Sequence, residues 1–414
     1  MRLGLLLFLL LPPSTGLTQP WFQDGFESAK PILVFDQNEG GHGGFQQGAY
    51  QRDAAQPSAF NWTRQSRFVG PTTPSLSWKF PTQSGLVGTP IGGPVVGREG
   101  QILFNSWDGK LYALDPSGRT RWIYEFEFPD WNLSTPLIGA DGTIYTGTFS
   151  HERAFYAITP DGRLKWKFRT DYWIGGAAIA ADGTIYVGGG DGNLYALSPK
   201  GMLRWQRSLG TYIQAAPVVG SDGVVYVGSN ANVNSGNPPL GRFYAVYPNG
   251  ELKWSMDLGD IIGAAAIGSD GTIYVGSLSQ PGLYAINPEG SLKWRFVDGE
   301  WRSAASAPAI GADGTIYFGA EAYGRGRLYA VSTDGKAKWH FETSAMIRAA
   351  PIVSANGLIY VGAYNGHLYA LRANGALAWK YGLPEAVLFS SSPTLAADGT
   401  LYVGCYDGML YAFQ

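Results

Sequence analysis

The sequence has little of the chemistry that disulfide frameworks and metal centres require. Cys405 is the sole cysteine among 414 residues, which excludes a disulfide within the chain. The four histidines, His42, His151, His340 and His367, show no spacing typical of a zinc site. We therefore expect stability to come from packing, and we expect Cys405 to be a small buried side chain.

Charge is also scarce and balanced. Charged residues make up 15% of the sequence, and the formal net charge is −2. Such a chain has no electrostatic drive toward nucleic acid or anionic lipid. Neither is expected as a main partner.

Long apolar runs are missing as well, apart from one at the start. Arg2 is followed by an apolar stretch from Leu3 to Leu11 and by the small residues Ser14, Thr15 and Gly16. This pattern predicts an export signal over residues 1–16, and the run is too short for a permanent membrane span. We expect a periplasmic or secreted protein with no integral membrane segment after signal cleavage. An uncleaved anchor is the alternative.

The sequence is rich in glycine, tyrosine and tryptophan, with 58, 24 and 14 residues, and it repeats. A Leu-Tyr-Ala or Phe-Tyr-Ala tripeptide occurs eight times, and a glycine and a tryptophan follow the first seven copies at fixed spacing. Self-similarity with a period of about 40 residues marks a solenoid, an array or a propeller. The repeated tyrosines are Tyr112, Tyr156, Tyr195, Tyr244, Tyr284, Tyr329, Tyr369 and Tyr411.

The two ends of the repeat decide between these folds. The last copy ends at Gln414, one strand short, whereas a lone strand around Trp78 precedes the first complete copy. A linear solenoid would need capping repeats, which we do not find. We predict an all-β protein: an eight-bladed β-propeller of four-stranded antiparallel blades over residues 75–414, with the strand around Trp78 completing the last blade.

The residues between signal and propeller differ in composition. Residues 17–74 contain the run Asn38-Glu39-Gly40-Gly41-His42-Gly43-Gly44, which is typical of a linker. We interpret residues 17–74 as an N-terminal extension or linker. Its apolar part, from Trp21 to Phe35, would alternatively add a strand or contact a partner.

The tryptophan of the outermost strand recurs in every blade, so its role is expected to be architectural. We predict packing between neighbouring blades, with each indole N–H bonded to backbone. These docking residues are Trp78, Trp122, Trp166, Trp205, Trp254, Trp294, Trp339 and Trp379.

The two faces of the ring are expected to differ. With strands A to D running outward, the A–B and C–D turns lie on one face, the turn face, and the B–C and D–A connections lie on the other, the loop face. The A–B turn is Asp-Gly in six blades, as tight hairpins require. The B–C connections vary in length, so we take the loop face as the working face.

The loop face also collects aromatic and arginine side chains, which is the composition of protein-binding hot spots and of sugar-stacking platforms. Three of the rings belong to neighbouring blades and are expected to form an arc: Trp107, Tyr364 and Tyr406. The alternative is that the rings only close the channel mouth. The candidate binding residues are Trp107, Trp131, Tyr172, Trp173, Tyr212, Trp301, Arg302, Tyr323, Arg348, Tyr364, Phe389 and Tyr406.

The repeat resembles that of a known family. Ala113-Leu114-Asp115-Pro116-Ser117-Gly118 with Trp122, and Ala196-Leu197-Ser198-Pro199-Lys200-Gly201 with Trp205, resemble the tryptophan-docking repeat of quinoprotein-type, PQQ-like propellers. The chain is also similar to the propeller subunit of the outer-membrane barrel-assembly machinery, which implies a non-catalytic scaffold. The catalytic branch implies pyrroloquinoline quinone and calcium over the ring axis, with adjacent cysteines in the alcohol-oxidising type.

The single cysteine and the absence of a convincing Glu, Asn and Asp set argue against that catalytic branch. We expect a monomeric, non-catalytic scaffold without cofactor or metal, binding a protein of the cell envelope or an extended ligand. The alternative is a glycan or small-molecule site at the channel mouth, including a quinone-dependent dehydrogenase. Carboxylates for a polysaccharide-acting enzyme would come from Asp130, Asp171, Asp260 and Glu300.

Overall fold

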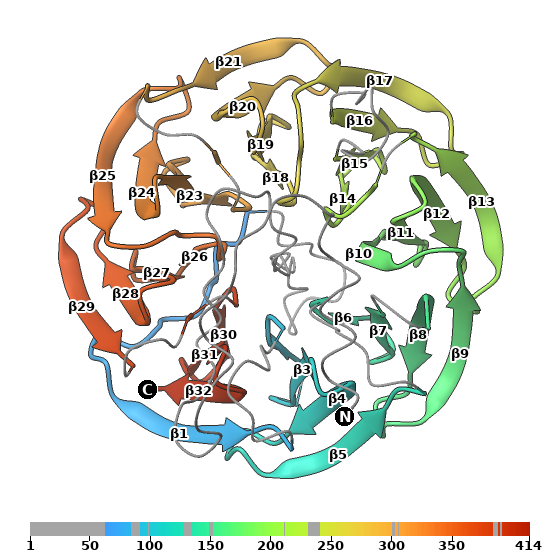
Figure 1. The fold of residues 1–414 in the computed structure, drawn as a ribbon, viewed down its shortest axis with the longest axis horizontal. Coiled ribbons are helices and arrows are strands. Elements are labelled where there is room, and N and C mark those ends of the chain that lie inside the picture. The colour runs from blue at the N-terminus through green and yellow to red at the C-terminus, as the bar shows by residue number, and fades with distance from the viewer. Residues whose placement is uncertain are drawn as a thin grey trace, which may run out of the picture. The chain divides into compact units, whose positions relative to one another are not determined.

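The computed structural model describes residues 63–83, 92–97, 99–127, 134–148, 152–210, 212–230, 241–299, 303–304, 306–383, 388–389 and 391–414. In these segments the regular structure is entirely β-strand and forms eight four-stranded sheets. The sheets stand around a central axis as blades (Figure 1). The predicted eight-bladed propeller is confirmed. No helix within these segments is long and apolar enough to cross a bilayer.

Blades 1 to 4 follow one another along the chain, each with strands A to D in order from the axis outward (Figure 1). Blade 1 contains β2 (Val95–Val96), β3 (Ile102–Ser106), β4 (Lys110–Leu114) and β5 (Thr120–Glu125). Blade 2 contains β6 (Leu137–Ile138), β7 (Ile144–Gly147), β8 (Ala154–Ile158) and β9 (Leu164–Arg169). Blade 3 contains β10 (Ile174–Ile179), β11 (Ile185–Gly189), β12 (Asn193–Leu197) and β13 (Leu203–Ser208). Blade 4 contains β14 (Val218–Val219), β15 (Val225–Gly228), β16 (Arg242–Val246) and β17 (Leu252–Asp257).

Blades 5 to 8 continue the ring, and the last of them combines both ends of the repeat region. Blade 5 contains β18 (Ala266–Ile267), β19 (Ile273–Ser277), β20 (Gly282–Ile286) and β21 (Leu292–Phe296). Blade 6 contains β22 (Ala309–Ile310), β23 (Ile316–Ala322), β24 (Arg325–Val331) and β25 (Ala337–Thr343). Blade 7 contains β26 (Ile352–Val353), β27 (Ile359–Gly362), β28 (His367–Leu371) and β29 (Leu377–Gly382). Blade 8 contains β30 (Thr394–Leu395), β31 (Leu401–Gly404), β32 (Met409–Phe413) and β1 (Leu76–Pro81).

Ring closure follows the prediction from the two ragged ends. The N-terminal strand β1 pairs antiparallel with the C-terminal strand β32, and Trp78 lies opposite Ala412. The ring is therefore closed by hydrogen bonds between the first and last strands, which leaves no blade short of a strand.

The docking tryptophans join each blade to the next. Each indole Nε1–H donates to a backbone carbonyl at 2.7 to 3.2 Å, as Trp122 does to Pro160. The ring lies against a glycine, and a Cβ on Gly162 would come within 2.6 Å of Trp122. Trp379 of blade 7 docks in the same way against blade 8, where its indole N–H donates to the carbonyl of Pro71. In blade 8 the segment before β1 takes the place of the C–D turn, because β1 is the outermost strand of that blade.

The end of the N-terminal extension is part of the propeller. Gln65 pairs in parallel with Val353, next to the innermost strand β26, and this segment, blue in Figure 1, runs from the centre of the ring toward its rim. Arg64 is buried and donates to the carbonyls of Pro351 (2.8 Å) and Pro393 (3.2 Å). The boundary placed at residue 75 is therefore corrected: residues 63–74 belong to the folded ring and not to a linker.

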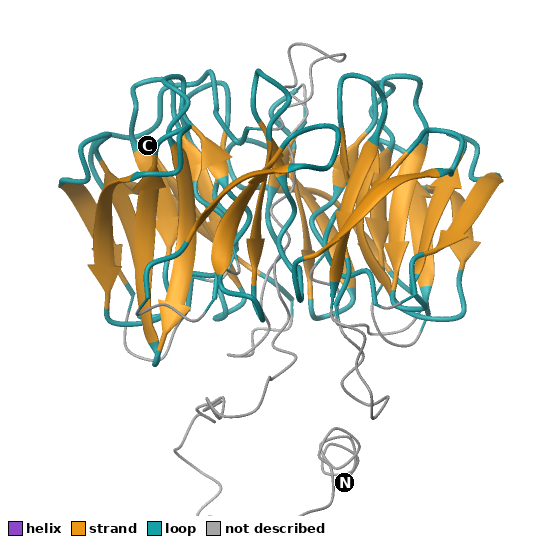
Figure 2. Cartoon of the chain, turned by 90° about the horizontal axis from the view of Figure 1, so that it is seen from above, coloured by secondary structure: helices purple, strands orange, loops and turns teal. Residues whose placement is uncertain are grey.

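Charges hold the A–B turns on the turn face. Figure 2 shows the loops gathered at the two ends of the strands. In blade 6, Asp313 accepts from the backbone N–H (3.0 Å) and hydroxyl (2.7 Å) of Thr315 and from Lys338 (3.0 Å) on the outermost strand. The following glycine, Gly314, has φ +79°. We call this set the turn clamp; it recurs at Asp141, Asp182 and Asp270.

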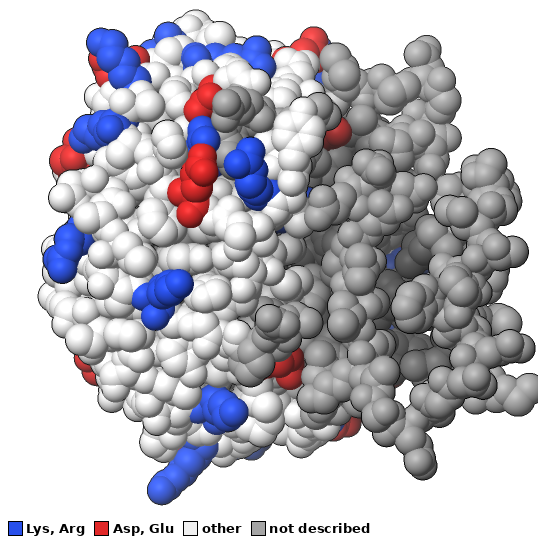
Figure 3. Space-filling model, turned by 60° about the vertical axis from the view of Figure 1, so that its left-hand side comes forward, with Lys and Arg blue, Asp and Glu red and all other residues white. Residues whose placement is uncertain are grey.

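The core lies between blades. Strands B and C are buried almost throughout, and a single apolar cluster combines Tyr186 of blade 3 with Val225 of blade 4. Cys405 has no exposed surface, as expected. On the side of the molecule in Figure 3, the surface is mostly uncharged, and several of its charged side chains lie beside side chains of opposite charge.

A candidate partner-binding face

The two kinds of connection on the loop face form one hydrogen-bonded layer. The backbone N–H of Gly190, in the B–C turn of blade 3, donates to the carbonyl of Trp173 in the preceding D–A segment at 2.8 Å. The N–H of Tyr406 donates in the same way to Leu388 at 3.1 Å. These two B–C hairpins are thus bonded to the segments that enter their own blades.

The expected aromatic arc is present on blades 7, 8 and 1. The ring centroid of Tyr406 lies 6.5 Å from that of Trp107 and 6.5 Å from that of Tyr364. Tyr406 itself is only 6% exposed, and the other two rings are half-buried. The arc therefore lines the face and does not project from it.

Arg348 continues this arc toward blade 6. Its guanidinium lies 5.9 Å from the centre of the Tyr364 ring and holds both oxygens of Glu321, at 2.8 and 3.0 Å. Burial disfavours the charged guanidinium, but the hydrogen bonds and charge of Glu321 outweigh it and raise the pKa of Arg348. Arginine and carboxylate thus neutralise one another beside the aromatic rings.

A second aromatic group lies on blades 3 and 4. We call Tyr172, Trp173 and Tyr212, together with Arg153, the Tyr172 cluster. The rings of Tyr172 and Tyr212 are stacked, with centroids 5.9 Å apart and planes inclined by 18°, and Trp173 lies 6.3 and 6.0 Å from them. Tyr172 is 41% exposed. This cluster therefore presents a large aromatic side chain to solvent.

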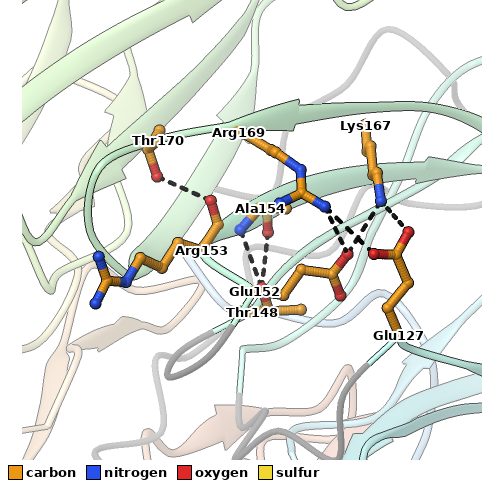
Figure 4. A network of polar contacts seen from close by, with 8 residues as sticks. All are labelled: Glu127, Thr148, Glu152, Arg153, Ala154, Lys167, Arg169 and Thr170. Carbon is orange, nitrogen blue, oxygen red and sulfur yellow. Dashed lines mark hydrogen bonds and ion pairs between the residues drawn. The ribbon is translucent and has the colours of Figure 1, made fainter.

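Contacts of Arg153 with the neighbouring backbone hold the Tyr172 cluster in place; Figure 4 shows the contact with Thr170 and the nearby ion pairs of Glu152. Arg153 has φ +50°, its guanidinium lies 5.7 Å from the centre of the Tyr172 ring, and its Nη1 donates to the carbonyl of Asp171 at 2.9 Å. The N–H of Thr170 donates to the Arg153 carbonyl at 2.9 Å. Beside Arg153, the buried Glu152 accepts from Lys167 at 3.3 Å. These contacts therefore fix the position of Arg153 against the Tyr172 ring.

The sequence contains one signal for this cluster, the glycine at position 190. A Cβ on Gly190 would lie 2.3 Å from the Trp173 ring, so the glycine leaves the space that the indole fills. The equivalent turn position in blades 1, 7 and 8 holds Trp107, Tyr364 and Tyr406. In blade 3 the neighbouring segment supplies the ring instead, which explains why glycine occurs there.

The short B–C turns share another contact that the sequence reading missed. The hydroxyl of Tyr411 donates to the carboxylate of Asp407 at 2.5 Å, and Tyr112 with Asp108 and Tyr195 with Asp191 do the same. The spacing Asp-Gly-x-x-Tyr is its signature. These aspartates therefore stabilise the turns in which they lie.

The remaining predicted residues divide into three groups. Tyr323 is strongly exposed at the tip of a B–C hairpin. The prediction for Phe389 is wrong. Its side chain is fully buried, and its ring centroid lies 5.9 Å from that of Tyr411, so Phe389 belongs to the core and not to the binding face. Outside the described residues are Trp131, Trp301, Arg302, Asp130 and Glu300.

The described residues do not fit a quinone and calcium group. Among them, no three of His, Cys, Asp and Glu lie close enough to hold a metal ion, and Glu321 near the mouth already accepts two bonds from Arg348. The segments leading into the inner strands carry small residues, such as Ala349, Ala350 and Ser392.

A closed ring of eight tryptophan-docked, four-stranded blades defines the class of PQQ-like propellers. The family model described as outer membrane protein assembly factor BamB matches residues 66–238 and 282–414, more than half of the sequence. The chain belongs to this family.

Solved structures share the fold, and a curated protein is similar in sequence over a short part of the chain. The chain is similar to quinohemoprotein alcohol dehydrogenase from Comamonas testosteroni, with a TM-score of 0.69, 15% identity, and coverage of 85% of this chain and 78% of the other. For BamB from Moraxella catarrhalis the TM-score is 0.63, with 16% identity and coverage of 83% and 100%. The uncharacterized protein YxaL of Bacillus subtilis (strain 168) is 38% identical over 92 residues, 22% of this chain and 21% of that protein. At these identities the solved structures show the fold alone.

Proposed function

We propose that this protein is an exported, non-catalytic scaffold that binds a protein partner in the cell envelope through its loop face. The observation that carries the proposal is the Tyr172 cluster. Aromatic rings with an arginine, partly exposed and held by backbone bonds, have the composition of binding hot spots. Membership of the BamB family supports a scaffold role.

The rigidity of the face also supports binding. Ordering side chains at an interface costs free energy, so contacts that are fixed in advance leave more of the interaction energy for affinity. In the Tyr172 cluster, the guanidinium of Arg153 donates to the carbonyl of Asp171, and the carbonyl of Arg153 accepts from the N–H of Thr170. The cluster would therefore dock without rearranging.

Export is part of the proposal. The run from Leu3 to Leu11 that predicts a signal lies outside the described residues. The name of the matched family refers to assembly at the outer membrane, which agrees with a protein that leaves the cytoplasm. We propose a periplasmic location.

Partner retention from an envelope extract tests the proposal. The variant Tyr172→Ala removes an exposed ring of the loop face, and the control Tyr247→Ala removes an equally exposed ring, 41% in both cases, from the turn face. We expect one protein to be retained by the wild type and the control and lost from Tyr172→Ala. Equal retention by both variants would contradict a role for this cluster.

A second measurement distinguishes a scaffold from a quinone-dependent dehydrogenase. A quinone enzyme would show cofactor absorbance and a melting temperature that rises when quinone and calcium are added together. A scaffold would show neither. An oligosaccharide that competes for the Tyr172 cluster in the retention assay would support a glycan ligand instead.

A further inference from the structure

A pair of amide side chains lies beside the Tyr172 cluster. Tyr212, whose ring stacks on that of Tyr172, forms an antiparallel bridge with Asn230, just after strand B of blade 4. The backbone N–H of Asn230 donates to the carbonyl of Tyr212 at 2.8 Å. The side-chain Nδ2 of Asn230 donates to Oε1 of Gln214 at 2.9 Å. The stacked tyrosines and the amide pair therefore belong to one part of the loop face.

The amide pair is left with unused hydrogen-bonding atoms. Oδ1 of Asn230 is buried, and no atom of the described residues donates to it. Nε2 of Gln214 makes no hydrogen bond within these residues either. A buried acceptor without a donor costs free energy, and few such groups remain in folded proteins. Asn230 therefore requires a donor from outside the protein, from solvent or from a ligand.

The two equivalent positions carry a charged pair elsewhere on the loop face. Glu321 of blade 6 corresponds to Asn230, and Arg348 of blade 7 corresponds to Gln214, as the backbone bonds of the repeat show. Arg348 donates to both oxygens of Glu321, at 2.8 and 3.0 Å, so the carboxylate is satisfied within the protein. The amide pair lacks this mutual saturation, which distinguishes it as a place for a ligand.

The backbone that carries the amide pair is firmly packed. The segments that enter blades 3 and 4 lie against each other, and a Cβ on Gly175 would come within 2.5 Å of the carbonyl oxygen of Ile213. The N–H of Ile213 donates to the carbonyl of Gly189 at 3.1 Å. Asn230 and Gln214 are themselves partly exposed. A ligand can therefore reach the pair, and a rotation about the soft terminal torsion of Asn230 turns Oδ1 toward it.

We propose that Asn230 and Gln214 bind the main chain of an extended peptide segment of the protein partner, which lies along the Tyr172 cluster. This inference rests on the proposed function and names the chemical group that the face recognises. An extended peptide residue offers one N–H donor and one C=O acceptor, and the pair offers the acceptor Oδ1 and the donor Nε2. The tyrosine rings supply contact area for the side chains of the segment. Solvent supplies the missing donor in the free protein, and the peptide N–H replaces it on binding.

The test uses peptides in which single main-chain N–H groups are removed. A phage-displayed library of random dodecapeptides is selected on the purified wild-type protein, and peptides that bind the wild type but not Tyr172→Ala are kept. Each is then synthesised with an N-methyl group at one residue at a time. Affinities are measured for the wild type, for Asn230→Leu, which has a similar shape but no acceptor, and for Asn230→Asp, which keeps an acceptor.

We expect N-methylation at one position to lower the affinity for the wild type at least about tenfold. The same methyl group should change the affinity for Asn230→Leu less than about twofold, because the acceptor is already absent. Asn230→Asp should keep the sensitivity to N-methylation. The control Asn249→Leu removes an asparagine of the same blade from a C–D turn on the turn face, and it should bind all peptides like the wild type.

Four results would overturn the inference. These are equal effects of N-methylation in wild type and Asn230→Leu, full affinity of the unmodified peptides for Asn230→Leu, loss of the N-methyl sensitivity in Asn230→Asp, and competition by chitohexaose that Asn230→Leu abolishes, since the last would assign the amides to a glycan. If Tyr172→Ala loses the envelope partner while Asn230→Leu keeps both partner and peptide, only this inference fails. If the wild type retains no envelope partner and selects no peptide, the proposed function fails with it.

Discussion

The turn face and the loop face of the ring are built from different kinds of residue. On the turn face the same contact returns from blade to blade, as with the turn clamp of Asp313, Thr315 and Lys338. On the loop face the side chains differ between blades, and the exposed aromatic residues Tyr172 and Tyr323 occur once each. Residues that recur support the ring, whereas those that do not are free to serve a partner.

The largest effect should come from removing a recurring residue. Trp379 is buried, and its indole N–H donates to Pro71 at the seam where the two chain ends meet. Trp379→Ala should lower the free energy of unfolding by about 3 to 5 kcal/mol, the usual cost of deleting a buried aromatic ring. Tyr172→Ala should cost less than about 1 kcal/mol. Urea unfolding of both variants measures this difference in the free energy of unfolding, and equal losses of free energy in the two variants would contradict it.

A slightly smaller loss is expected at Arg64. Its guanidinium is buried in the ring and donates to the carbonyls of Pro351 and Pro393. Arg64→Met keeps the aliphatic length but leaves both carbonyls without this donor. We expect a loss of about 2 to 3 kcal/mol in urea unfolding. Arg67→Met, at an exposed position nearby, is the control and should be neutral. An unchanged free energy of unfolding in Arg64→Met would show that the bonds from the segment before β1 do not stabilise the ring.

The comparison also explains what the sequence could predict. The fixed spacing of the repeat determined the number of blades, the closing strand and the docking tryptophans, because each copy confirmed the others. The entry of residues 63–68 into the ring left no such signal, since their bonds go to carbonyls of residues such as Pro351 and Val353, which any sequence supplies. Phe389 was placed on the surface because a connection without periodicity does not show which side chains turn inward.

Blade 3 shows how part of the loop face could have been found. Gly188, Gly189 and Gly190 form a run in the sequence that by itself indicates only a connection between two strands. In the structure a Cβ on Gly188 would meet Ile213, and one on Gly190 would meet the Trp173 ring. Gly188 and Gly190 each lie close to a side chain of another segment. The sequence does not show that Trp173 is the neighbour of Gly190, because that requires the register between the two segments.

Gly190→Ala sharpens the comparison, because it disturbs the loop face and leaves the turn face intact. The new methyl group would lie 2.3 Å from the indole of Trp173, so the ring must move and carry the stacked tyrosines with it. We expect a loss of about 1 to 3 kcal/mol in urea unfolding, as for other overpacked sites. Partner retention should fall as it does for Tyr172→Ala. If Gly190→Ala retains the partner at the wild-type level, binding does not depend on the geometry of the Tyr172 cluster.

The smallest effect should be the pH dependence of a single turn clamp. Burial by itself raises the pKa of Asp313, but the bonds from Thr315 and the charge of Lys338 outweigh it and lower the pKa from 3.8 to about 2. The folded protein therefore binds fewer protons at this site than the unfolded chain, so the carboxylate stabilises the fold above pH 4 and loses this effect as the pH falls toward 2. Asp313→Asn should lower the free energy of unfolding by less than about 1 kcal/mol at neutral pH, because the clamp is solvent-exposed. The difference between the melting temperatures of wild type and variant should shrink as the pH falls through 2, and a difference that stays constant over this range would assign the effect to the turn backbone and not to the charge.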